Sequence, residues 1–121
     1  MRTGNRTVGP RLRLVLEPEI AIGPGKADLL EGIAETGSIA AAGRRMGMSY
    51  KRAWLLVEAM NASFKSSLVE TSKGGSRRGG AILTPTGTEV LYRYRRMETL
   101  TERAIRRELA ALHGLLADIS E

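Results

Sequence analysis

The chain has 121 residues, which is enough for one small domain, and 42% of them are apolar, so that a modest core can form. It contains no cysteine, which excludes disulfides and thiolate metal sites, and no apolar run reaches the ~20 residues that a membrane span needs. The excess behind the net charge of +6 lies within residues 38–80, where eight Lys or Arg accompany two Glu. This distribution fits a polyanionic partner, nucleic acid first, or a solvated basic surface, and charge alone does not choose between them.

The first residues predict a tail and then a strand. Residues 1–10 are polar and basic and lack the apolar stretch of a signal peptide, so we expect a disordered tail on a cytoplasmic protein. Residues 11–17 carry a leucine at every second position, the alternation of a strand with one buried face (Leu12, Leu14 and Leu16). Pro18 should end this strand.

Three helices are predicted next, and the second and third form a helix-turn-helix. The first helix covers residues 24–36 and ends at Gly37, where a left-handed conformation costs glycine little. Ser38 caps a second helix of small residues, which let another helix approach closely, and this helix ends at Gly47. Ser49 caps the third, and a short turn with glycine between two such helices is typical of the motif. The third helix has an apolar inward face (Ala53, Leu56, Val57, Met60 and Phe64).

The front of the third helix has the position and the chemistry of a recognition helix. Its first turn holds Tyr50, Lys51 and Arg52, away from the apolar face. Arginine and lysine reach guanine N7 and O6 or phosphate, and a tyrosine can offer its hydroxyl to a phosphate or its ring edge to a thymine methyl group. Trp54 has two interpretations: a half-buried core residue under the wing, which is the hairpin predicted after this helix, or a residue that contacts a base. We favour the first interpretation.

A hairpin with a basic tip follows the third helix. Residues 68–72 and 81–84 are β-prone and flank the glycine-rich loop KGGSRRGG, residues 73–80. Its cations suit phosphates, and one arginine could enter a minor groove. The alternatives are a flexible hairpin tip and a nucleotide-binding loop. The latter is disfavoured because G-K-[ST] is missing and no helix follows directly.

A long helix is predicted at the end of the chain. Thr84 is its N-cap and Pro85 its first residue, and the helix should extend to about His113, with an interruption at Gly114. Its later apolar residues recur at intervals of four and three, which is the spacing of a seam between paired helices (Ile105, Leu109, Leu112 and Leu116). We therefore expect these residues to make a homodimer.

The predicted fold is mainly α with a small β-hairpin, a winged helix-turn-helix. It divides into a tail (1–10), the DNA-binding domain (11–84) and a long C-terminal dimerisation helix (85–121). A catalytic interpretation finds a single histidine, His113, which suits the negative end of its helix, and no paired carboxylates or nucleophile motif. We expect no enzyme activity, no cofactor and no metal site.

The segment TGSIAAAGRRMGMSYKRAWLLVEAMN, residues 36–61, resembles the N-terminal DNA-binding domain of ModE, the bacterial molybdate-responsive regulator with a LysR-type helix-turn-helix. LVE, KGGSRRGG and LTPTG follow in the expected order, so that the resemblance covers about residues 11–112. It implies a homodimeric transcription factor whose Ser49, Tyr50, Lys51 and Arg52 meet DNA beside a basic wing.

The resemblance has one departure. ModE proteins carry a C-terminal molybdate-binding region, whereas this sequence ends at Glu121, so we expect a stand-alone member without a molybdate site. The function expected is a sequence-specific, DNA-binding transcriptional regulator. The alternative is a winged-helix protein-interaction module, which has no need of basic charge concentrated on the helix-turn-helix and wing. The residues expected at the DNA are Ser38, Arg44, Ser49, Tyr50, Lys51, Arg52, Lys73, Ser76, Arg77 and Arg78.

Overall fold

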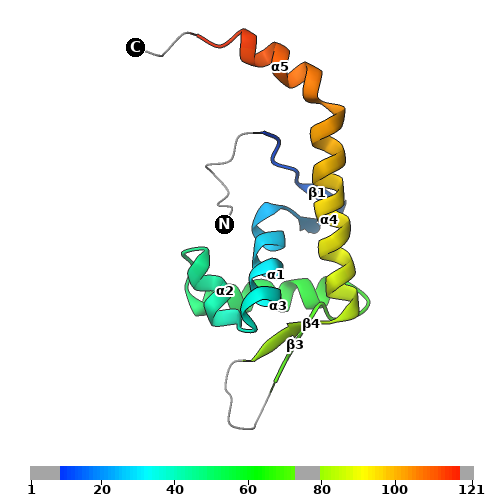
Figure 1. Cartoon of the computed structure of the whole chain (residues 1–121). Helices are drawn as coiled ribbons and strands as arrows, with labels where there is room; N and C mark the ends of the chain where they lie inside the picture. The colour runs from blue at the N-terminus through cyan, green and yellow to red at the C-terminus, as the bar shows by residue number, and fades with distance from the viewer. Residues whose placement is uncertain (1–8, 73–79, 118–121) are drawn as a thin grey trace.

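The computed structural model describes residues 9–72 and 80–117. Three helices form a compact body, a hairpin projects from it, and a long helix runs along its side (Figure 1). This is the predicted winged helix-turn-helix. In chain order the elements are β1 (Leu14–Glu17), β2 (Ile20–Ile22), α1 (Pro24–Thr36), α2 (Ile39–Arg45), α3 (Tyr50–Ser63), β3 (Val69–Thr71), β4 (Ala81–Leu83), α4 (Pro85–Ala104) and α5 (Arg106–Gly114).

The start of the fold is a hairpin rather than the single strand that the sequence predicted. β1 pairs antiparallel with β2, with an irregularity in register between Val15 and Glu17. Pro18 ends β1 as expected, but it belongs to a turn, and the chain returns at once. Leu16 is 52% exposed, so the expectation that the alternating leucines share a buried face is wrong for this residue. A three-residue strand such as β2 is too short to show its own alternation.

The main core lies among α1, α2, α3 and the β3–β4 hairpin. The side chains of Leu29, Leu30 and Ile33 on α1 are fully buried there, each worth about 1.5–3 kcal/mol. The helices approach closely because small residues meet: a Cβ built on Gly43 would lie 3.0 Å from the Cβ of Ala53. This confirms that the small residues of the second helix serve close packing.

A second, smaller cluster attaches α4 to the body. Tyr94 of α4 is 1% exposed and packs with Ile22 and Ala27. Its hydroxyl donates a hydrogen bond of 2.5 Å to the carbonyl oxygen of Leu12. Burial above all, with a contribution from the negative charge of Glu98, raises the pKa of Tyr94 to about 12.

An ion cluster adds a polar link between α4 and α1. Arg95 donates to Asp28 at 2.8 Å, to Glu31 at 2.7 Å and to Glu98 at 3.1 Å. Burial works against the charge of Arg95, but the hydrogen bonds to these three carboxylates outweigh it and raise the pKa of the guanidinium. The direction in which α4 leaves the body is therefore set by an apolar contact and by charged hydrogen bonds.

The C-terminal helix is interrupted earlier than predicted. α4 ends at Ala104, Ile105 has φ −102° and ψ 7°, and α5 begins at Arg106. In Figure 1 α5 turns away from the line of α4. The spacing of apolar residues misled the prediction because it records which residues share a helix face and not whether the backbone bends between them. None of the residues of α5 is buried.

Local signals elsewhere were interpreted correctly. Gly37 has φ 74° and follows α1 as its C-cap, and Thr84 caps α4 by accepting a hydrogen bond from the Gly87 amide, with Pro85 as the first residue. His113 lies in the last turn of α5, as expected. Within the described ranges, no helix has the length and hydropathy that crossing a membrane requires.

Candidate nucleic-acid interface

The helix-turn-helix consists of α2, a tight turn and α3. The amides of Met46 and Met48 both donate to the carbonyl oxygen of Gly43 at 3.0 Å, and Gly47 has φ 72°, a left-handed conformation that glycine adopts without strain. Ser49 then caps α3, its Oγ accepting a hydrogen bond from the Arg52 amide at 3.1 Å. This cap fixes where the first turn of α3 begins.

The first turn of α3 presents a polar and basic surface. Tyr50 is 54% exposed, and Lys51 and Arg52 are also exposed, whereas Ala53 and Val57 behind them are buried. The positive end of the helix dipole adds to the charge of the two cations. The sequence-predicted residues of α3 are therefore brought together on one outer surface.

Arginines of α2 differ in their availability. Arg45 donates to Glu35 at 2.7 Å, which neutralises it locally. Arg44 is exposed, and among the described residues Arg44, Lys51 and Arg52 make no ion pair. Since unpaired cations can bind an external anion without breaking an internal contact, these three side chains are available to phosphates.

Ser38 has a structural role as well as its predicted place at the interface. Its Oγ accepts a hydrogen bond of 3.0 Å from the Ala41 amide and so caps α2. Its backbone pairs with Gly80 in an isolated antiparallel bridge, and the Ala81 amide donates to the Gly37 carbonyl oxygen at 2.9 Å. The start of α2 is thus attached to the wing hairpin.

The wing hairpin consists of β3 and β4, antiparallel, as predicted. The Ser72 amide donates to the carbonyl oxygen of Gly80 at 2.9 Å, which closes the described part of the hairpin. The four wing residues predicted at the DNA lie outside the described residues (Lys73, Ser76, Arg77 and Arg78).

Sequence reasoning missed Asn61, which joins the end of α3 to the wing. Its Oδ1 accepts from the amides of Leu68 and Val69 at 2.8 and 3.1 Å, and its Nδ2 donates to the Val69 carbonyl oxygen at 3.1 Å. The sequence feature that could have identified this role is an asparagine near the end of a helix and shortly before a β-prone run. The side-chain amide can both accept and donate hydrogen bonds, as the backbone of a neighbouring strand does. Asn61 therefore positions the wing hairpin relative to α3.

Trp54 is half-buried and packs against the main core. This agrees with the interpretation that we favoured from the sequence, in which its ring is part of the body. It also explains why the single tryptophan of the chain stands beside two cations: the ring supports α3 from the side while Lys51 and Arg52 are exposed to solvent.

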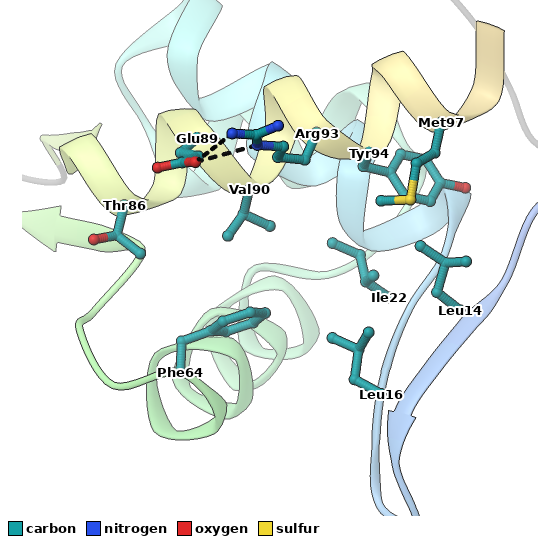
Figure 2. A pocket seen from close by; sticks show the side chains of 10 residues that line it. All are labelled: Leu14, Leu16, Ile22, Phe64, Thr86, Glu89, Val90, Arg93, Tyr94 and Met97. Atoms are coloured by element: carbon teal, nitrogen blue, oxygen red, sulfur yellow. Dashed lines mark hydrogen bonds and ion pairs between the residues drawn. The ribbon is translucent and has the colours of Figure 1, made fainter. Parts of the chain in front are cut away.

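An apolar groove lies on another side of the molecule, between the β1–β2 hairpin, α4 and the end of α3. It has a volume of about 280 Å³. Figure 2 shows leucines of β1 and Phe64 on one side, with Val90 and Met97 of α4 opposite and the Glu89–Arg93 ion pair along α4. Within the described residues, no group of three or more His, Cys, Asp or Glu could hold a metal ion.

Comparisons with known proteins agree with this geometry. The family model "Bacterial regulatory helix-turn-helix protein, lysR family" matches residues 26–88, more than half of the chain. The DNA-binding transcriptional dual regulator ModE of Escherichia coli (strain K12) is 34% identical over 113 residues, which are 90% of this chain and 43% of that protein. The molybdenum-pterin-binding protein MopB of Rhodobacter capsulatus is 43% identical over 77 residues, 64% of this chain and 28% of that one. The chain thus spans less than half the length of these relatives.

Solved structures show the same likeness. The CbnR_DBD–DNA complex matches with a TM-score of 0.58 and 28% identity over 73% of this chain and 95% of that one. Full-length CbnR complexed with its target DNA matches with a TM-score of 0.55 and 30% identity, over 72% of this chain and 28% of that one. The matching family model and the ModE relative are described as transcriptional regulators, which agrees with the expectation that this chain is not an enzyme. The chain belongs to the lysR family of bacterial regulatory helix-turn-helix proteins, and it carries the DNA-binding winged helix-turn-helix domain of such a transcriptional regulator.

Proposed function

We propose that this chain binds duplex DNA in a sequence-specific manner, with the first turns of α3 in the major groove. The observation that carries the proposal is the exposed set of Tyr50, Lys51 and Arg52 on a helix whose opposite face is buried; within residues 9–72 and 80–117 neither cation makes an ion pair. Arg44 adds a cation from α2. The likeness to CbnR, which was solved with DNA, supports this orientation of the motif.

The wing is proposed to contact the flanking backbone or the minor groove. Lys73, Ser76, Arg77 and Arg78 follow β3 in the sequence, and the hairpin is held to α3 by Asn61. Phosphate contacts carry no sequence information. Removal of Arg77 and Arg78 should therefore weaken binding to all sequences alike, whereas loss of Lys51 or Arg52 should change the preference among sequences.

We also propose that two copies pair through their C-terminal helices. Leu112 on α5 and Leu116 just beyond its end are strongly exposed in the single chain, and Met97 and Leu100 on α4 are partly exposed. Pairing about a two-fold axis would remove this apolar surface from water. It would also present two recognition helices to half-sites about 34 Å apart or a multiple of that, so operators should be inverted repeats.

The runner-up is a protein-interaction module, and the apolar groove beside β1 is the observation in its favour. An interaction module gains nothing from the exposed cations Arg44, Lys51 and Arg52. The names of the relatives refer to molybdenum, but the resemblance on which our expectation rests is to the DNA-binding portion of ModE. We therefore propose that this chain does not bind molybdate.

The test of DNA binding is fluorescence anisotropy of labelled duplexes across a salt series. The variant Lys51→Ala with Arg52→Ala should lose affinity, by roughly 1–3 kcal/mol for each bidentate pairing with a base, and removal of each cation that binds a phosphate should flatten the salt slope by about one. The matched control is Arg96→Ala with Arg103→Ala, which removes the same charge from exposed positions on α4. Equal affinity of the two double variants would contradict the proposal.

A further inference from the structure

The outer face of α3 changes character after its first turn. Lys51 lies at the centre of this face, and the residues at helical spacing from it, namely Leu55, Glu58 and Ala62, are all exposed. Leu55 is 54% exposed. Positive charge on this face is thus confined to the first turn, and an apolar side chain stands one turn further along.

A single exposed leucine is ordinary on a protein surface, so its position decides its significance. Leu55 follows Lys51 by four residues, which places it directly beside that cation on the face that we propose for DNA. Packing does not require it there, because the buried residues of α3 are Ala53, Val57 and Met60 on the opposite side.

Glu58 indicates which part of the DNA the second turn of α3 would contact. A carboxylate is repelled by phosphates but can accept hydrogen bonds from the amino groups of cytosine and adenine at the base edges. A face with Leu55 and Glu58 therefore suits the floor of the major groove better than the backbone at its rim. Lys51 and Arg52 in the preceding turn supply positive charge that attracts the DNA and offsets the repulsion of Glu58 by the phosphates.

We infer that Leu55 is a specificity-determining residue that reads thymine through its C5-methyl group. Thymine is the base that presents an apolar group in the major groove. A leucine set against any other base edge would cover hydrogen-bonding atoms without offering them a partner. This inference rests on the proposed entry of α3 into the major groove.

The experiment removes one methyl group at a time from the DNA. Sites are first selected from a random duplex pool with the full chain, and each thymine of the preferred half-site is then replaced by deoxyuridine, which keeps every hydrogen-bonding group. At one or two positions wild type should bind about fourfold more weakly, the factor that corresponds to about 0.8 kcal/mol for one buried methyl group.

Variants assign this readout to Leu55. In Leu55→Ala the penalty for deoxyuridine at those positions should disappear, whereas Leu55→Met should keep it. Val15→Ala is the matched control, because Val15 is an exposed aliphatic residue on β1, and it should behave as wild type. Circular dichroism and thermal unfolding of Leu55→Ala should match wild type, since this side chain is not part of the core.

Two results would overturn the inference: a half-site in which no thymine is sensitive to deoxyuridine, or a penalty that persists unchanged in Leu55→Ala. Both differ from a failure of the proposed function, which would appear as the absence of saturable, salt-dependent binding of wild type to any duplex.

Discussion

Gly87 lies where the first turn of α4 meets the backbone that enters β3. A Cβ built on it would stand 2.1 Å from the carbonyl oxygen of Leu68, a backbone atom that cannot move away without displacing the wing. The same carbonyl accepts a hydrogen bond from the Thr84 amide at 2.9 Å. We predict that Gly87→Ala lowers the free energy of unfolding by about 3 kcal/mol, through overpacking, as measured by urea denaturation.

Gly25 provides the control for this prediction. It lies in α1, and nothing would stand within 4 Å of its added Cβ. Gly25→Ala should leave stability unchanged or raise it by about 0.4–1 kcal/mol, because alanine restricts the unfolded chain. Equal effects of the two substitutions would show that the approach of Gly87 to Leu68 is not tight in solution.

Tyr94 makes stability depend on alkaline pH. Burial raises its pKa from 10 to about 12, so the neutral phenol is favoured in the folded state. Its contribution is complete below pH 10 and disappears as the pH rises through 12. Tyr94→Phe removes the hydrogen bond to Leu12 and should cost about 1 kcal/mol at pH 8.

The free energy of unfolding of wild type, relative to that of Tyr94→Phe, should fall as the pH rises from 10 to 12. Urea denaturation at each pH measures it. Tyr92→Phe is the control, because the side chain of Tyr92 is exposed, and it should track wild type throughout. A constant difference between wild type and Tyr94→Phe over this range would contradict the raised pKa.

At the scale of elements, the N-cap of α3 couples folding to recognition. Ser49→Ala removes the hydrogen bond to the Arg52 amide and should cost about 1 kcal/mol of stability. Ser49→Asp keeps a capping oxygen and suits the helix dipole, so it should preserve the thermal midpoint. Its negative charge should nevertheless weaken DNA binding in anisotropy measurements.

These two variants separate capping from the interaction with DNA. Ser66→Ala is the matched control, since Ser66 is exposed and lies beyond the end of α3, and it should change neither property. Undiminished affinity of Ser49→Asp for DNA would place the first turn of α3 outside the interface.

At the scale of the whole molecule, the proposed dimer depends on exposed leucines of α5 and of the residues directly after it. We predict that Leu112→Asp with Leu116→Asp gives a monomer in sedimentation at micromolar concentration, with helix content preserved and most operator affinity abolished. Both side chains are exposed in the single chain, so the substitutions leave the core intact. Leu109 is less suitable for an Asp substitution because its side chain is half-buried and lines a pocket with Gly9 and Pro10, so the substitution would also disturb the single chain.

The control for the dimer is Ile82→Asp. Ile82 is exposed on β4, and β4 and α5 lie at opposite ends of the molecule in Figure 1, so this substitution should leave the sedimentation of wild type unchanged. A wild-type chain that sediments as a monomer under the same conditions would refute the pairing of C-terminal helices.

The proposal that this chain does not bind molybdate can be tested by thermal unfolding. A ligand at ~100 times its dissociation constant stabilises a protein by about 2.7 kcal/mol. We expect no saturable rise of the thermal midpoint of this chain with molybdate, and sulfate at equal ionic strength is the control for nonspecific anion effects. A shift specific to molybdate would show that the 121 residues include a site that our proposal denies.

The sequence by itself determined the features that depend on a few neighbouring residues. The caps Ser38, Ser49 and Thr84 and the left-handed Gly37 are local hydrogen-bond and backbone preferences, and the structure has each of them. The outward cations of α3 were likewise predictable, because helical spacing sets them opposite the apolar residues.

The tertiary structure alone decided how these elements meet. The strand β2, the bend at Ile105, the anchoring of β3 by Asn61 and the close approach of Gly87 to Leu68 follow from packing. Arg95 meets Asp28, 67 positions away in the chain. Such contacts leave no periodic or motif signal, because each partner is an ordinary helix residue until the fold brings the two together.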